Sequence, residues 1–214
     1  MNQPFNGQQA RLGAIRSLIV NFWPDAFIET GTFIRSTTRF FSGNGVPVYI
    51  AELKRSFWFL STLRLGSGSD AVLMRAEYVA ILRWLAEVRP FERPLVYLDA
   101  HWWSDITVES ELNILFDAWP DVLVIVGDFR VDSDPGYAYD DYKGVTLSLE
   151  DIMIPPATTA AFPALPAAEE TGARRGTLYL ARGNDVRRAL GELVEECLLR
   201  ALNVEQREPE CAVP

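Results

Sequence analysis

The stretch from Phe27 to Phe41, FIETGTFIRSTTRFF, constrains the fold more than any other part of the chain. An apolar strand pattern runs into the turn ETGT at 29–32, and Ser36 then opens a short helical pattern. Strand, glycine turn and helix N-terminus in this order build the nucleotide sites of open α/β sheets. Glycine lets the backbone approach the ligand, and the unpaired N–H groups of the helix face it. We therefore expect a ligand site at Gly31.

The rest of the chain repeats this strand–helix step. Further apolar runs predict strands at Val46–Leu53, Ala71–Glu77, Pro94–His101, Asp121–Phe129, Val145–Leu149 and Gly176–Arg182. Helical periodicity follows most of them, and a last amphipathic helix is predicted to begin with Asp185 as its cap and to reach Leu202, with Cys197 and Leu198 inward. The pattern predicts an α/β fold with a doubly wound, mostly parallel, Rossmann-like sheet of seven strands and helices on both faces.

The segment 130–176 departs from this pattern, because it is rich in acids, tyrosines and prolines. A long irregular stretch inside a globular chain is commonly a functional loop. We therefore expect residues 1–214 to form a single domain in which 130–176 is a loop or lid insertion over the ligand site.

Composition excludes several classes of partner. The net charge of −9 argues against nucleic acid, which needs clustered Lys and Arg. The cysteines, Cys197 and Cys211, give no disulfide framework, which favours a reducing compartment. No apolar run reaches the roughly 18 residues of a membrane span, and the N-terminus lacks a signal-peptide pattern. We expect a cytoplasmic protein that binds neither nucleic acid nor membrane, and leave a homo-oligomer open.

Acidic residues mark the ends of the predicted parallel strands: Glu29, Glu52, Glu77, Asp99 and Asp128. In an open α/β sheet these carboxyl ends line one crevice, so the acids are expected to gather in space. An acidic crevice suits a ligand that carries hydroxyl and amine groups, and it suits a pyrophosphate poorly.

The fragments ETGTFIRSTTRFF, VYIAEL, VYLDAHW and VLVIVGDF resemble the class I S-adenosylmethionine-dependent methyltransferases, and among them the small bacterial proteins related to macrocin O-methyltransferase. The resemblance covers roughly residues 25–129. It implies S-adenosyl-L-methionine as cofactor, with Glu52 on the ribose hydroxyls, Glu77 and Tyr78 by the adenine, and Asp99 under the sulfonium. The full set of implied cofactor contacts is Glu29, Gly31, Thr32, Thr37, Thr38, Glu52, Leu53, Glu77, Tyr78 and Asp99.

Two other cofactors are weighed against this one. Metal-dependent relatives usually carry two adjacent aspartates after the fifth strand, whereas this chain has Gly127-Asp128-Phe129. A divalent metal held by Asp99 and Asp128 is therefore not favoured. The step from Gly31 to Glu52 matches the roughly 20-residue spacing of dinucleotide sites, but the turn lacks the G-x-G-x-x-G spacing.

His101 is the single histidine of the chain and follows Asp99 closely, so it is the candidate general base, with packing on Trp102 as the alternative. Asp99 and Asp128 would orient the base or the acceptor; alternatively they cap neighbouring helices. Both acids would also favour a cationic sulfonium.

The predicted substrate contacts are Trp102, Trp103, Tyr137, Arg174 and Arg175. The two indoles would wall an acceptor pocket or pack in the core. The tyrosine, together with Tyr139 and Tyr142, would belong to a lid over the acceptor; alternatively the acids of this loop are simply a solvated face. The two arginines would bind a carboxylate or phosphate of the acceptor, or pair with the acidic loop.

The sequence thus predicts an S-adenosylmethionine-dependent methyltransferase, an O-methyltransferase in first place, that acts on a small hydroxyl- or amine-bearing acceptor. The alternatives are a catalytically silent binding module with the same fold and, less favoured, a nicotinamide-dependent reductase.

Overall fold

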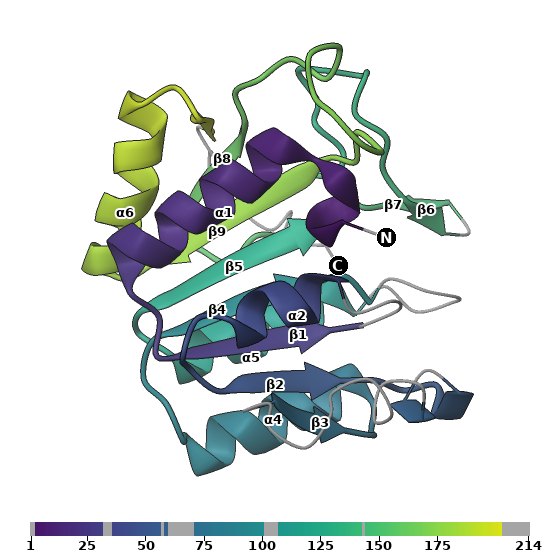
Figure 1. The fold of residues 1–214 in the computed structure, drawn as a ribbon, viewed down its shortest axis with the longest axis vertical. Helices are drawn as coiled ribbons and strands as arrows, with labels where there is room; N and C mark the ends of the chain where they lie inside the picture. The colour runs from purple at the N-terminus through teal and green to yellow at the C-terminus, as the bar shows by residue number, and fades with distance from the viewer. Residues whose placement is uncertain are drawn as a thin grey trace, which may run out of the picture.

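A central eight-stranded sheet organises the protein, which was analysed as a computed structural model describing residues 3–31, 36–56, 58–59, 71–100, 107–142 and 144–202. The strand order is β10-β8-β9-β5-β4-β1-β2-β3 (Figure 1). The strands are β1 Ala26–Thr30, β2 Val48–Ala51, β3 Ala71–Met74, β4 Pro94–Leu98, β5 Val122–Gly127, β8 Thr159–Pro163, β9 Thr177–Arg182 and β10 Leu199–Leu202. A separate hairpin pairs β6 Asp141–Tyr142 with β7 Val145–Thr146.

Five neighbouring strands, from β3 through β2, β1 and β4 to β5, are parallel. β9 pairs antiparallel with β5, and β8 and β10 continue antiparallel at that edge. Because the chain moves from β1 to β2 on one side and to β4 on the other, the order reverses between β1 and β4. Open α/β sheets place their ligands at such a reversal, outside the carboxyl ends of the strands.

Helices cover both faces of the sheet, as the pattern predicts. α1 Gln9–Phe22, α2 Ser36–Ser42 and α6 Asn184–Glu195 cover one face, and α4 Tyr78–Val88 and α5 Val108–Ala118 cover the other (Figure 1). β1, β4 and β5 are buried along their whole length, and they divide the apolar core into one cluster on each side. Within the described ranges no helix combines the length and apolarity that a bilayer crossing requires.

The predicted count of seven strands is wrong, because β8 and β10 were not anticipated and the expected strand at Val145–Leu149 is only the short β7 outside the main sheet. β8 lies in the stretch that composition marked as irregular. β10 lies where the final helix was expected to continue to Leu202.

The final helix ends early for a local reason. α6 ends at Glu195, and Cys197 then adopts a left-handed backbone with φ 57°, which stops the helix. Leu199 pairs with Pro163, so the chain returns as β10 and both Cys197 and Leu198 are exposed. Asp185 is not the helix cap, since Gly183 occupies that position.

The N-terminal segment is fastened to residues 170–176, which are distant in the sequence. Pro4–Gly7 form a short 3-10 helix, η1, that leads into α1. The Glu170 carboxylate accepts hydrogen bonds from the backbone N–H groups of Ala10 at 3.2 Å and Arg11 at 3.3 Å. Thr171 accepts a third from Gln9 at 2.9 Å. These residues satisfy the N–H groups that a helix start leaves unpaired and place a negative charge at the positive end of its dipole.

Replacement of Glu170 by alanine is expected to lower the free energy of unfolding by about 1–2 kcal/mol, the usual cost of losing an N-cap acceptor. Urea unfolding followed by circular dichroism measures the change. Glu169→Ala is the matched control, because Glu169 is exposed next to it and the described contacts place no side-chain hydrogen bond on it. Equal effects of the two substitutions would show that the cap contributes nothing.

Candidate functional site at the carboxyl ends of the parallel strands

Three of the five acids predicted to gather, Glu29, Glu52 and Asp99, lie at the carboxyl ends of neighbouring parallel strands. Glu29 lies in β1 beside Tyr97 of β4, and Glu52 directly follows β2. The N–H of Asp99 donates to Thr30 O at 3.1 Å, which ties the end of β4 to the end of β1. All these strands run in the same direction, so their ends share the edge that faces the hairpin β6–β7 (Figure 1).

The turn after β1 requires glycine. Gly31 has φ 77°, a left-handed conformation that side chains disfavour, and its N–H donates to Ala51 O of β2 at 3.0 Å. A Cβ there would lie 2.9 Å from both Ala100 Cα and Asp99 O. The backbone therefore passes between the ends of β2 and β4 with no room for a side chain. Thr32, the next predicted contact, lies outside the described residues.

Glu29 is buried and accepts a hydrogen bond from the Thr38 hydroxyl in α2. This bond fixes the start of α2 above the end of β1. Thr37 differs, because its hydroxyl accepts from the backbone N–H of Phe5 at 3.5 Å and so faces the N-terminal segment. The cofactor roles of these three residues stay predictions.

A second group of predicted contacts forms around Glu52. Its side chain is 3% exposed, and one carboxylate oxygen accepts from the Lys54 N–H at 2.8 Å. Burial raises the pKa of Tyr78 to about 12, the negative charge of Glu52 adds to the rise, and a hydrogen bond with the Leu53 backbone opposes it. Glu52, Leu53 and Tyr78 are therefore neighbours. Glu77 is exposed, and its carbonyl accepts from Ile81 N–H at the start of α4.

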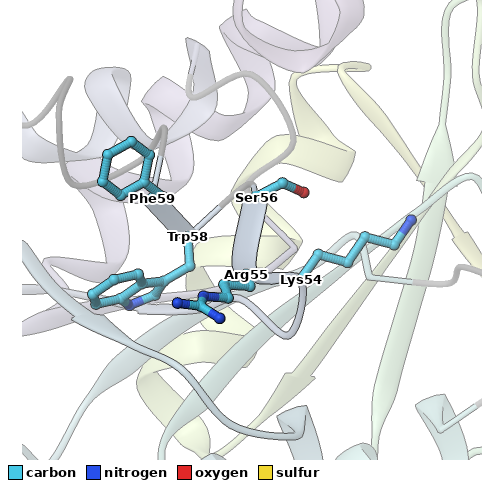
Figure 2. A pocket seen from close by; sticks show the side chains of 5 residues that line it. All are labelled: Lys54, Arg55, Ser56, Trp58 and Phe59. Atoms are coloured by element: carbon cyan, nitrogen blue, oxygen red, sulfur yellow. The ribbon is translucent and has the colours of Figure 1, made fainter.

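The residues that follow Leu53 in the sequence line a pocket of about 770 Å³. They are Lys54, Arg55, Ser56, Trp58 and Phe59. Its lining combines two cationic groups with two aromatic rings, and Phe59 is 56% exposed. In Figure 2 the Lys54 side chain extends away from the two rings. Residues 55–56 and 58–59 of this lining are helical. No residue of this lining was predicted as a contact.

Asp99 lies at the other end of the site, over Gly127 of β5. A Cβ on Gly127 would lie 2.5 Å from Asp99 Oδ1 and 3.2 Å from the Tyr97 hydroxyl, so both side chains depend on this glycine. Burial raises the pKa of Asp99 well above its ordinary value, the charge of Asp128 adds to the rise, and the Arg11 guanidinium counters it. Asp99 is therefore held among like charges, with a cation opposing them.

The two predicted arginines point in different directions. Arg175 bridges two carboxylates: its Nε donates to Asp128 Oδ1 at 2.7 Å, and its Nη2 donates to Asp140. This is the pairing with the acidic loop that the sequence left open. Arg174 is exposed, and its Nε donates to the backbone oxygen of Glu170 at 3.1 Å.

Tyr137 is 1% exposed and donates its hydroxyl to Leu165 O at 2.9 Å, so its ring anchors the 130–176 segment in the apolar core. Its predicted role as a substrate contact stays a prediction. His101, Trp102 and Trp103 lie outside the described residues, and their predicted roles stay predictions. Across the residues that are described, no group of three His, Cys, Asp or Glu side chains is arranged to hold a metal ion.

Sequence reasoning missed Arg11, whose side chain is 3% exposed and reaches the Asp99 end of the site. It lies on the buried stripe of α1 together with Ile15, Leu18 and Phe22. A charged residue inside an apolar helical stripe was the available signal, because buried charges need a partner.

Glu111 was also missed. It lies in the first turn of α5, is fully buried, and neither carboxylate oxygen makes a hydrogen bond of ordinary geometry to the described residues. Burial raises its pKa to about 7, although the nearby Thr107 hydroxyl opposes the rise. Its charge also contributes to the raised pKa of Tyr78, which places it near the Glu52 group.

Comparison with known proteins identifies the fold of the chain but does not assign it to a family. No family model matches the chain, and no curated protein matches it. Among solved structures, a putative O-methyltransferase from Klebsiella pneumoniae superposes with TM-score 0.59 at 18% identity, covering 82% of this chain and 81% of that one. A putative caffeoyl-CoA O-methyltransferase from Staphylococcus aureus gives 0.56 at 14%, covering 82% and 84%. A putative methylase from Haemophilus influenzae gives 0.54 at 13%, covering 85% and 100%. The chain therefore has the fold of these methyltransferase-like proteins.

The buried Glu111 predicts a pH-dependent stability. Its pKa in the folded protein, about 7, exceeds the ordinary 4.5, so the folded state binds this proton more tightly than the unfolded chain. The resulting stabilisation is complete below pH 4.5 and is lost as the pH rises through 7. The loss amounts to about 3 kcal/mol, taking 1.36 kcal/mol per pKa unit.

Urea unfolding between pH 5 and pH 8 measures this effect. Relative to Glu111→Gln, the wild type is expected to lose stability as the pH rises, whereas Glu109→Gln, in the same helical turn, should follow the wild type. A difference between wild type and Glu111→Gln that does not change with pH would contradict the assignment.

Proposed function

We propose that this protein is an S-adenosylmethionine-dependent methyltransferase. The observation that carries the proposal is the row of acids at the ends of β1, β2 and β4, which lies beside the Gly31 turn at the reversal of strand order. The shared fold with methyltransferase-like structures supports it. The cofactor would supply a methyl group on a positively charged sulfur.

The residues present fit such a cofactor. The Glu52 carboxylate can accept hydrogen bonds from two ribose hydroxyls, and charged acceptors make the stronger hydrogen bonds. Leu53, Tyr78 and Glu77 would border the adenine. Glu29 and Gly31, with Thr32, Thr37 and Thr38, would hold the amino-acid part. Asp99 would favour the cationic sulfur, since an anion in a partly desolvated site attracts a nearby cation more strongly than it does in water.

We infer that catalysis rests on alignment and proton removal. Fixing an acceptor hydroxyl in line with the methyl group removes much of the entropic barrier to a two-molecule reaction. His101 would take the proton of that hydroxyl as general base, with Asp99 and Asp128 orienting it. The proposed acceptor is a small molecule with a hydroxyl or amine, walled by Trp102 and Trp103 and bordered by the 130–176 segment on the acceptor side.

Calorimetry tests the cofactor directly. Wild-type protein is expected to bind S-adenosylmethionine and S-adenosylhomocysteine saturably, with no saturable binding of NADH. Glu52→Ala is expected to weaken the binding of both nucleosides by about 1.5–3 kcal/mol, which is the usual contribution of hydrogen bonds to a charged group. This corresponds to a roughly 10- to 150-fold increase in Kd. Glu87→Ala, on the exposed part of α4, is the control. Preferential binding of NADH would favour the reductase instead.

The ion pairs of Arg175 keep a second candidate open, a binding module with this fold and no catalysis. Arg175 already engages Asp128 and Asp140, so two acids at the acceptor end are occupied by the chain itself. Methyl transfer to fractionated small-molecule extracts separates the two functions. Transfer that is lost in His101→Ala supports the enzyme, whereas cofactor binding without transfer to any fraction supports the module.

A further inference from the structure

Arg11 brings a buried positive charge to the Asp99 end of the site. Its Nη2 donates to the carbonyl oxygens of Arg175 and of Gly176, the latter at 3.1 Å, and its Nη1 donates to the Tyr97 hydroxyl at 3.4 Å. Its Nε is buried and has no hydrogen-bond partner among the described residues. The guanidinium is therefore anchored on one side by neutral oxygens, which do not cancel its charge.

The Tyr97 hydroxyl links Arg11 to Asp99 in space. Tyr97 and Asp99 are two residues apart at the end of β4, so they project from the same face of the strand. Both side chains lie over Gly127, where a Cβ would meet Asp99 Oδ1 at 2.5 Å and the Tyr97 hydroxyl at 3.2 Å. Arg11, Tyr97 and Asp99 thus form one cluster across a glycine that leaves room for it.

Most of the charged groups that act on Asp99 are negative. Asp128, Glu29 and Asp140 all disfavour its ionised form, and burial does so most strongly. Arg175 is engaged between Asp128 and Asp140. Arg11 is the cation that most favours the ionised form of Asp99. Burial alone would lower the pKa of Arg11, but Tyr97, Tyr179, Asp128 and Asp99 raise it overall, so the guanidinium stays charged.

We propose that Arg11 is a positioning residue whose guanidinium, next to Tyr97 and Asp99 over Gly127, favours the ionised form of the Asp99 carboxylate. It thereby sets the preference of the site for a ligand with a cationic sulfonium over the neutral thioether that remains after transfer. The inference rests on the proposed function, because Asp99 can discriminate these two ligands only if their sulfur lies beside it.

The experiment measures the affinities of S-adenosylmethionine and S-adenosylhomocysteine by calorimetry at several pH values across the range in which the protein stays folded. Arg11→Gln keeps amide donors for the carbonyl oxygens and removes the charge, whereas Arg11→Lys keeps the charge. Arg16→Gln is the matched control, because Arg16 is an exposed arginine of the same helix. The quantity compared is the ratio of the two affinities, which a general loss of folding would not change.

In the wild type this ratio should rise with pH in favour of the sulfonium as Asp99 ionises. In Arg11→Gln the midpoint should move upward by about one pH unit, within the range expected for loss of a nearby opposite charge. The ratio at a pH below the new midpoint should then fall by up to roughly tenfold. Arg11→Lys and Arg16→Gln should keep the wild-type midpoint.

Equal weakening of both ligands in Arg11→Gln, with an unmoved midpoint, overturns the proposal and leaves the methyltransferase assignment intact. If Arg11→Gln does not fold, Asp99→Asn decides: the pH dependence of the ratio must disappear, and its persistence overturns the proposal. Wild-type protein that binds neither ligand refutes the proposed function and this inference with it.

Discussion

The close approach of β1 and β4 at Gly31 is the constraint on which the site depends. The Gly31 backbone turns in a left-handed conformation against the carbonyl of Asp99, with no space for a Cβ. The bond from Asp99 N–H to Thr30 O closes the same junction. Because this junction fixes where both strands end, it also fixes where the acids of β1 and β4 face each other. A bulkier residue would separate the strand ends and with them the acidic edge.

Gathering carboxylates at one edge creates an electrostatic cost that the rest of the chain offsets. Glu29, Asp128 and Asp140 all disfavour the ionised form of Asp99, whereas the Arg11 guanidinium favours it and Arg175 pairs with Asp128 and Asp140. Both arginines, Arg11 and Arg175, lie where the N-terminal segment meets residues 170–176. There the Gln8 side chain forms hydrogen bonds with the backbone of Arg175. The fastening of the N-terminus to 170–176 is therefore a structural requirement of the site, since it holds both cations in place.

The sequence predicted the parallel part of the sheet well, because β4 and β5 are continuous apolar runs between clear stop signals and β1 begins with apolar residues just before the glycine turn. It failed where local pattern and tertiary context disagree. Thr159–Pro163 contains small residues and a proline, and it becomes β8 because β9 and β10 offer pairing partners on both sides. The residues after Cys197 continue the helical periodicity, but one left-handed residue redirects them into β10.

The candidate site shows the same difference between features that a local sequence pattern reveals and features that depend on tertiary packing. Acids at strand ends are visible in a sequence because each follows an apolar run, so Glu52 and Asp99 could be found. Arg11 was visible only as a charge inside an apolar helical stripe, and Glu111 as one of two acids in the first turn of its helix, so the roles of both depend on what packs around them. Only the folded chain shows that Arg11 meets residues more than 80 positions away.

The arrangement at α2 argues for a sulfonium nucleoside over a dinucleotide. A pyrophosphate would need the start of the helix after β1, where backbone N–H groups attract anions. In this chain the Glu29 carboxylate already lies there, bonded to Thr38 in the first turn of α2. Asp99 lies at the adjoining strand end, so an incoming phosphate would meet two carboxylates. A ligand whose reactive centre carries a positive charge would be attracted by the same two groups in their ionised forms, and this difference in sign supports the proposed methyl donor over a dinucleotide.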